Sequence, residues 1–191
     1  FAKVNLERGS FQEAVNALDA YLDNYPNGIY ANEAENLLTD ALINTNNYLR
    51  AIEHIEKMSR KSERLKAAYQ KITFYQGLVY YRDKKHDLAT NYFDKSLASP
   101  IDKDLVVQAH FWKGENFAAT NRSPQAIKSY ETLQSLKPKI TDPYLVKSYY
   151  GLGYTYFNLQ QYTKAENQFR QYVDKGGKND DSDKYDEALV R

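Results

Sequence analysis

The sequence predicts an all-α protein, an α-α superhelix in which helical hairpins stack as a right-handed solenoid. Three observations favour this fold class. The chain of 191 residues contains only 8 Gly and 5 Pro, too few turn residues for a many-stranded sandwich or barrel. A small residue followed four positions later by a large one recurs at nearly constant spacing. Another small residue precedes most of these pairs by twelve positions.

The recurring pair begins with an alanine in each of five units, and successive alanines are 37, 38, 37 and 39 residues apart. The pairs are Ala14 with Leu18, Ala51 with Ile55, Ala89 with Phe93, Ala126 with Tyr130, and Ala165 with Phe169. Twelve residues before these alanines stand Ala2, Thr39, Gly77, Gly114 and Gly153. Glycine costs a helix about 1 kcal/mol relative to alanine. Its recurrence at matching positions therefore indicates close packing, where a small residue admits a neighbouring helix.

Each unit is expected to contain a first helix, a tight turn, a second helix and a helix breaker. First helices are predicted at about 29–45, 62–83, 103–120 and 143–159, with residues 1–8 as the end of an earlier one. Second helices are predicted at about 10–24, 47–59, 87–98, 123–136 and 162–174. Ser123 and Asp142 are predicted caps because each precedes a proline. Asn27-Gly28 and Gly176-Gly177 are predicted stops.

A glycine followed three residues later by Tyr or Phe, and then by A-x3-F/Y and a proline, resembles the tetratricopeptide repeat. The strongest matches are Gly114, Phe117, Ala126, Tyr130 and Pro138 in one unit, and Leu152, Gly153, Tyr156, Ala165 and Phe169 in the next. The first two units match through Ala14, Tyr21, Pro26, Ala51 and Ile55. The period exceeds the family's roughly 34 residues, and the family's Trp in the first helix is replaced by Thr73, His110 and Tyr149.

The longer units resemble repeats of bacterial envelope proteins of the BamD and YbgF type. This resemblance implies a periplasmic or outer-membrane-associated location, with the cytoplasm as the alternative.

The whole chain, residues 1–191, is expected to form a single solenoid. Its units are predicted at about 1–28, 29–61, 62–101, 102–140 and 141–178, with another starting at 182–191. Neither end resembles the polar helix that closes a solenoid, so the protein is expected to continue in both directions. A basic segment relieved only by Glu63 is expected to be a solvated corner. It consists of Lys57, Arg60, Lys61, Arg64, Lys66 and Lys71.

Composition and motifs argue against an enzyme. Twenty-six basic and 25 acidic residues give a charge of +1, so no long-range field directs the chain to nucleic acid. No stretch is apolar enough for membrane insertion. There is no cysteine, and the three histidines lie in different units, with His110 expected in packing. Asp180, Asp181 and Asp183 are interpreted as a solvated corner ending in a Ser182 cap, since they lack calcium-loop spacing. No metal and no cofactor are expected.

The first helices line the concave face in the tetratricopeptide family, and this register implies a set of partner-binding residues. They are Lys71, Phe74, Leu78, Tyr81, Phe111, Glu115, Lys147, Tyr150, Tyr154 and Phe157, and the same register includes Gln108 and Ala118. The matching positions of an earlier unit are mostly polar, namely Glu33, Asn36, Asp40 and Ile43. An aromatic strip suits an extended peptide or an amphipathic helix. The alternative is that the rings only pack between neighbouring helices.

The predicted function is a non-enzymatic scaffold that binds a peptide or partner protein of unknown identity in this concave groove. The family's carboxylate clamp is excluded, because its Lys and Asn positions hold other residues here. The alternative function is a structural spacer between domains outside this chain. Exposed rings would favour binding, and rings buried between helices would favour the spacer.

Overall fold

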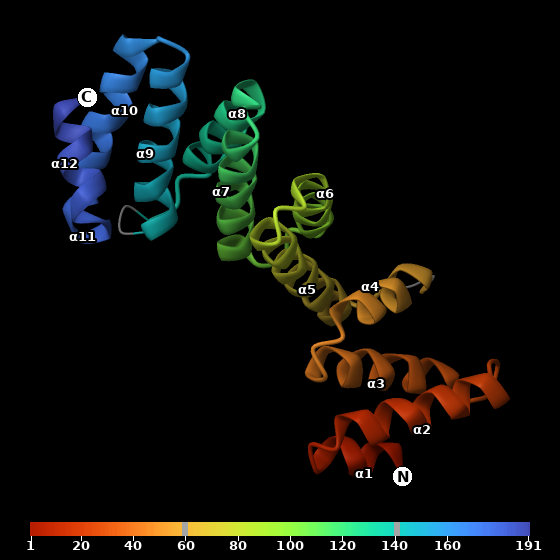
Figure 1. Cartoon of the computed structure of the whole chain (residues 1–191). Coiled ribbons are helices and arrows are strands. Elements are labelled where there is room, and N and C mark those ends of the chain that lie inside the picture. Colours follow the sequence, from red (N-terminus) through yellow and green to blue (C-terminus); the bar gives the residue numbers. More distant parts are fainter. Residues whose placement is uncertain (59–60, 140–141) are drawn as a thin grey trace.

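The computed structural model describes residues 1–58, 61–139 and 142–191, and within these ranges every regular element is a helix. Figure 1 shows the helices stacked as a curved array with the two termini at opposite ends. The helices are α1 (Ala2–Glu7), α2 (Phe11–Asn24), α3 (Ala31–Asn44), α4 (Tyr48–Lys57), α5 (Glu63–Arg82), α6 (His86–Leu97), α7 (Lys103–Ala119), α8 (Ser123–Ser135), α9 (Pro143–Asn158), α10 (Tyr162–Asp174), α11 (Gly177–Asp180) and α12 (Ser182–Val190). The predicted fold class is confirmed.

The predicted helix bounds agree with α2 to α10 to within two residues at each end. The predicted end of one helix at Ser59, and the unit boundary near residue 140, lie outside the described residues. The short helix α11 was missed, because Gly176-Gly177 was interpreted only as a stop. Gly176 does break the chain direction with a left-handed φ of +105°, but Gly177 then begins α11.

One predicted cap is confirmed and two are wrong. The Asp142 side chain accepts hydrogen bonds from the backbone N–H groups of Tyr144 and Leu145, at 2.8 and 3.3 Å. Ser123 is instead the first residue of α8, and Arg122 occupies its cap position without a side-chain hydrogen bond. Asp181, not Ser182, caps α12, because its carboxylate accepts from the first N–H groups of that helix. A carboxylate also suits the positive end of the helix dipole.

The recurring small and large residues form the core, as the repeat predicted. All five alanines of the pairs are at most 2% exposed and their large partners at most 4%. A methyl group on Gly77 would lie 2.7 Å from the Phe93 ring, and one on Gly153 would lie 2.8 Å from the Phe169 ring. These distances are shorter than carbon atoms can approach, so the glycines are needed for the two helices of a hairpin to meet.

One buried glutamine of α5 holds the corner between α6 and α7. The Oε1 atom of Gln70 accepts hydrogen bonds from the backbone N–H groups of Ile101 and Asp102, at 3.0 and 2.7 Å. Its Nε2 group donates to the Asp102 carbonyl at 2.9 Å. The Asp102 N–H group is thereby satisfied, and the Ile101 N–H group and the Asp102 carbonyl gain a second partner, which fixes the direction in which α7 leaves.

Ion pairs connect neighbouring hairpins along the surface. Lys3 pairs with Glu33 at 2.5 Å, and Arg64 pairs with Asp40 at 2.8 Å. Two acidic residues of the polar N-terminal face are therefore engaged within the stack. Arg64 also belongs to the predicted basic corner, of which Arg60 lies outside the described residues. Exposed pairs of this kind each contribute about 0–1 kcal/mol, so the core rather than these pairs holds the stack together.

Candidate functional site

A groove of about 280 Å³ opens between α7, α9 and the segment that contains α11 and α12. Figure 1 places these helices at the C-terminal end of the array, in green to blue. The residues that line the groove are Phe111, Glu115, Ala118, Tyr130, Lys147, Tyr150, Gly151, Tyr154, Thr155, Asn158, Asp180 and Lys184. The structure thus brings together five of the ten sequence-predicted site residues, namely Phe111, Glu115, Lys147, Tyr150 and Tyr154.

The floor of the groove is a tyrosine and carboxylate pair. Tyr130 comes from the second helix α8, and its hydroxyl donates a 2.5 Å hydrogen bond to Glu115 Oε1. Burial raises the pKa of Glu115, although the Tyr130 hydroxyl and two nearby lysines act in the opposite direction. Burial, together with the adjacent carboxylate, raises the pKa of Tyr130 well above its usual value, so Tyr130 remains a donor.

A glycine makes room for this pair. A methyl group on Gly151 of α9 would lie 2.7 Å from the Tyr130 hydroxyl and 3.0 Å from Glu115 Oε1. The equivalent positions one and two units earlier hold Trp112 and Tyr75. Gly151 is therefore specific to this hairpin, and it opens the groove at the point where the carboxylate lies.

Two lysines line the groove, and each has an acidic partner at the end of α11 or directly after it. The Lys147 ammonium lies 3.4 Å from Asp180 Oδ1, and the Lys184 ammonium lies 3.6 Å from Asp181 Oδ2. The Lys184 ammonium also lies 5.5 Å from the centroid of the Tyr150 ring. The aspartates were predicted to be a solvated corner, but Asp180 belongs to α11, is 11% exposed and lines the groove, while Asp181 caps α12.

Helix α12 covers part of the aromatic strip on α9. The Tyr150 hydroxyl donates to Glu187 Oε2 at 2.6 Å. The Arg191 guanidinium lies 4.5 Å from the Phe157 ring centroid and 5.9 Å from that of Tyr154. Burial is the main cause that raises the pKa of Tyr150, followed by its bond to Glu187. Tyr150 and Tyr154 therefore contact this C-terminal segment and also line the groove, whereas the predicted site residue Phe157 lies against Arg191 and does not line the groove.

The four predicted residues on α5 do not join the groove. Phe74 is 1% exposed and packs against Phe93, so it is a core residue and offers no surface to a partner. This corrects its assignment to the binding strip, because the Phe74 ring packs within its own hairpin. Leu78 and Tyr81 are half-buried, with the Tyr81 ring centroid 5.3 Å from that of Trp112, and Lys71 is exposed.

Comparison with known proteins identifies a family model that matches one hairpin of the chain. Residues 146–174, which cover most of α9 and all of α10, match the model of the tetratricopeptide repeat. The hairpin of α9 and α10 is therefore similar to a tetratricopeptide repeat. No curated protein sequence matches the chain significantly.

Solved structures extend the tetratricopeptide fold to the rest of the chain. The crystal structure of MamA shares 18% identity over 94% of this chain and 96% of that one, with a TM-score of 0.54. YrrB shares 16% identity over 92% of this chain and 82% of that one, with a TM-score of 0.53. A putative kinesin light chain from Podosopora anserina shares 15% identity over 93% and 92%, with a TM-score of 0.50. At these identities the likeness concerns the fold.

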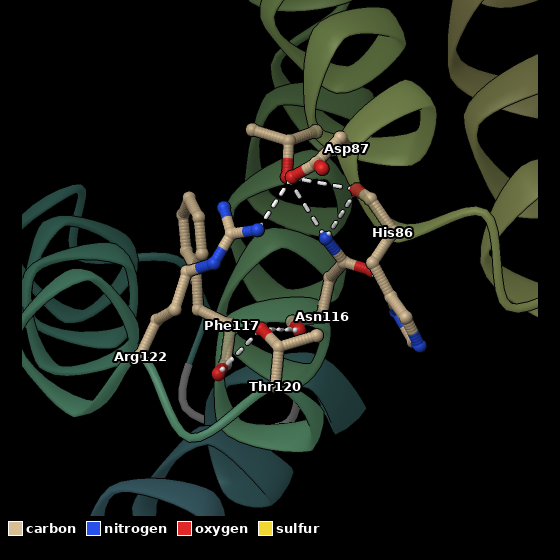
Figure 2. A network of polar contacts seen from close by, with 7 residues as sticks. His86, Asp87, Asn116, Phe117, Thr120 and Arg122 are labelled. Atoms are coloured by element: carbon tan, nitrogen blue, oxygen red, sulfur yellow. Dashed lines mark hydrogen bonds and ion pairs between the residues drawn. The ribbon is translucent and has the colours of Figure 1, made fainter.

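A second polar cluster joins two hairpins of the tetratricopeptide stack and is structural (Figure 2). The buried Asn116 of α7 donates to the His86 carbonyl at 2.9 Å and to Thr90 Oγ1 at 2.8 Å. Its Oδ1 atom lies 2.8 Å from His86 Nδ1. Arg122, in the turn after α7, pairs with Asp87 at 2.5 Å. These contacts fix the start of α6 against the end of α7.

The other chemistry-bearing residues of the chain are also dispersed. Burial, followed by the nearby Lys113, lowers the pKa of His110 to about 4, which fits a packing role. Among the residues that the structure describes, no three His, Cys, Asp or Glu side chains gather to hold a metal ion. Within the same ranges, no helix is both long and apolar enough to cross a bilayer.

Several groove residues of the tetratricopeptide stack were missed from the sequence. Gly151, Asp180 and Lys184 line the groove, and Tyr130 contributes its hydroxyl from a second helix. The sequence did contain one signal, because Gly151 lies two residues before the packing Gly153 and has no glycine equivalent in the earlier units. A glycine outside the repeat register marks a local need for space.

Proposed function

We propose that this chain is a non-enzymatic interaction scaffold that binds a peptide segment of a partner protein in the groove between α7, α9 and α12. The observation that carries the proposal is the groove itself. Aromatic rings, a carboxylate and lysine side chains converge there on one concave surface. Rigid rings with hydrogen-bonding groups are the usual composition of a peptide-binding surface. YrrB, which has the same fold, is described as a TPR protein with an unusual peptide-binding site.

The alternative function, a structural spacer, has its own supporting observations. Phe74 is buried, and α12 covers parts of Tyr150 and Phe157. If the aromatic residues serve only to pack the helices together, the groove has no ligand. The two functions therefore differ in whether filling the groove removes a binding activity.

The groove can be blocked without disturbing the core. Ala118 and Ala119 are adjacent exposed alanines of α7, but only Ala118 lines the groove. We expect Ala118→Trp to weaken binding of any groove ligand by about tenfold or more, because the indole occupies the space that the ligand needs. Ala119→Trp is the matched control and should leave affinity unchanged. Both variants should melt at nearly the parent temperature, since neither position is buried.

The measurement uses peptides selected from a random display library against the parent chain. Their affinities for the parent and for both tryptophan variants are then determined by fluorescence anisotropy. Loss of binding with Ala118→Trp alone supports the scaffold. Failure to select any peptide, or equal affinities for the three proteins, would favour the spacer.

A further inference from the structure

The groove contains one carboxylate whose hydrogen-bonding capacity is only half used. Glu115 Oε1 accepts from Tyr130, whereas Glu115 Oε2 receives no hydrogen bond from the residues that the structure describes. The side chain is partly buried and lines the groove, and Oε2 remains open to solvent there. A ligand that donates to Oε2 gains a charge-assisted hydrogen bond, which is stronger in a partly buried site than in bulk water.

Glu115 differs from the other charged side chains around the groove in its ion pairing. Each lysine of the groove is already paired with an aspartate, Lys147 with Asp180 and Lys184 with Asp181. In the described part of the chain, Glu115 has no ion-pair partner of its own. The local arrangement therefore carries one excess negative charge, and that charge lies at the floor.

Aromatic rings line the groove beside this carboxylate. Tyr154 of α9 is partly exposed there, and Phe111 of α7, which is 6% exposed, contributes only its edge. Gly151 leaves space next to the carboxylate. The methylene chain of a lysine or arginine packs well on such rings, and its charged end is attracted by their faces. The geometry suits a long side chain with a cationic end better than an acidic or short one.

We infer that the floor of the groove is a subsite for a basic side chain, lysine or arginine, of the bound peptide, and that Glu115 is its counter-charge. This inference rests on the proposed function and specifies the chemistry of its ligand. A single free carboxylate oxygen matches the point-like ammonium of lysine, whereas arginine favours two parallel hydrogen bonds. Lysine is therefore the expected preference between the two.

The test is a double-mutant cycle between Glu115 and the peptide. Glu115→Gln removes the charge but keeps an oxygen that accepts from Tyr130. The matched control is Asp104→Asn, which removes an equal charge from an exposed position near the start of α7. In each selected peptide, lysine is replaced by norleucine or arginine by citrulline. We expect the neutral replacement to weaken binding to the parent and to Asp104→Asn by about tenfold or more. The same replacement should have little effect on binding to Glu115→Gln.

The outcomes separate this inference from the proposed function. Peptides that bind, are blocked by Ala118→Trp, and need no basic residue would overturn the inference alone. An equal loss on neutralising the basic residue in the parent and in Glu115→Gln would also overturn it. If no peptide binds, or if Ala118→Trp has no effect, the inference falls together with the proposed function. Unchanged melting of Glu115→Gln verifies that its effect on affinity does not come from unfolding.

Discussion

Replacing Gly114 by alanine is expected to destabilise the fold by about 1–3 kcal/mol, and replacement by leucine by more. The added methyl group would lie 2.5 Å from the ring of Tyr130, which is 0% exposed and cannot move away. At an unhindered helical site the same change would stabilise by about 1 kcal/mol. The sign of the effect therefore tests the packing, and urea denaturation measures it. Ala118→Leu, on the exposed face of α7, should change stability little and serves as the control.

A compensating change makes this test more specific. Two units earlier, the matching positions hold Thr39 and Ile55, both buried. Combining Gly114→Thr with Tyr130→Ile copies that pair and should recover part of the stability that Gly114→Thr alone loses. Recovery is partial because Tyr130→Ile also removes the hydrogen bond to Glu115. Strictly additive effects of the two substitutions would contradict direct contact between the positions.

Gln70→Leu is expected to cost about 1–3 kcal/mol, the cost of leaving a polar group unpaired. The substitution keeps most of the volume but deprives the Asp102 N–H group of its partner, and it removes a second contact from the Ile101 N–H group and the Asp102 carbonyl. Gln108→Leu is the matched control, because this partly buried glutamine makes no side-chain hydrogen bond with the residues described. Equal stability of the two variants in urea denaturation would show that the hydrogen bonds from Gln70 to the corner between α6 and α7 contribute nothing to the free energy of unfolding.

The repeat explains how much could be predicted from the sequence. Helix positions and the packing glycines were predictable because the same steric requirement recurs in every unit, so Gly77, Gly114 and Gly153 reinforce one another. The role of Gln70 was not predictable, since the equivalent positions in the next two units are Val107 and Val146. A contact made once leaves no periodic signal. The same holds for Gly151.

The candidate groove was predicted only in part, for a different reason. The register of first helices predicted Glu115, Lys147 and Tyr154 as site residues, and all three line the groove. It could not tell how far each ring extends from the core. Phe74 is therefore buried against Phe93, although its register position matches that of the groove-lining Phe111. How deeply a ring is buried depends on the distance between neighbouring hairpins. That distance is set by residues that differ from unit to unit.

The central claim is that the concave groove between α7, α9 and α12 binds a peptide. Amide chemical-shift mapping tests it most directly, with the nitrogen-15-labelled chain titrated with a selected peptide. The account predicts saturable shifts concentrated on α7 around Phe111 to Ala118, on α9 around Lys147 to Asn158, and near Lys184. Shifts confined to the second helices α8 and α10, or to the N-terminal hairpins, would contradict it.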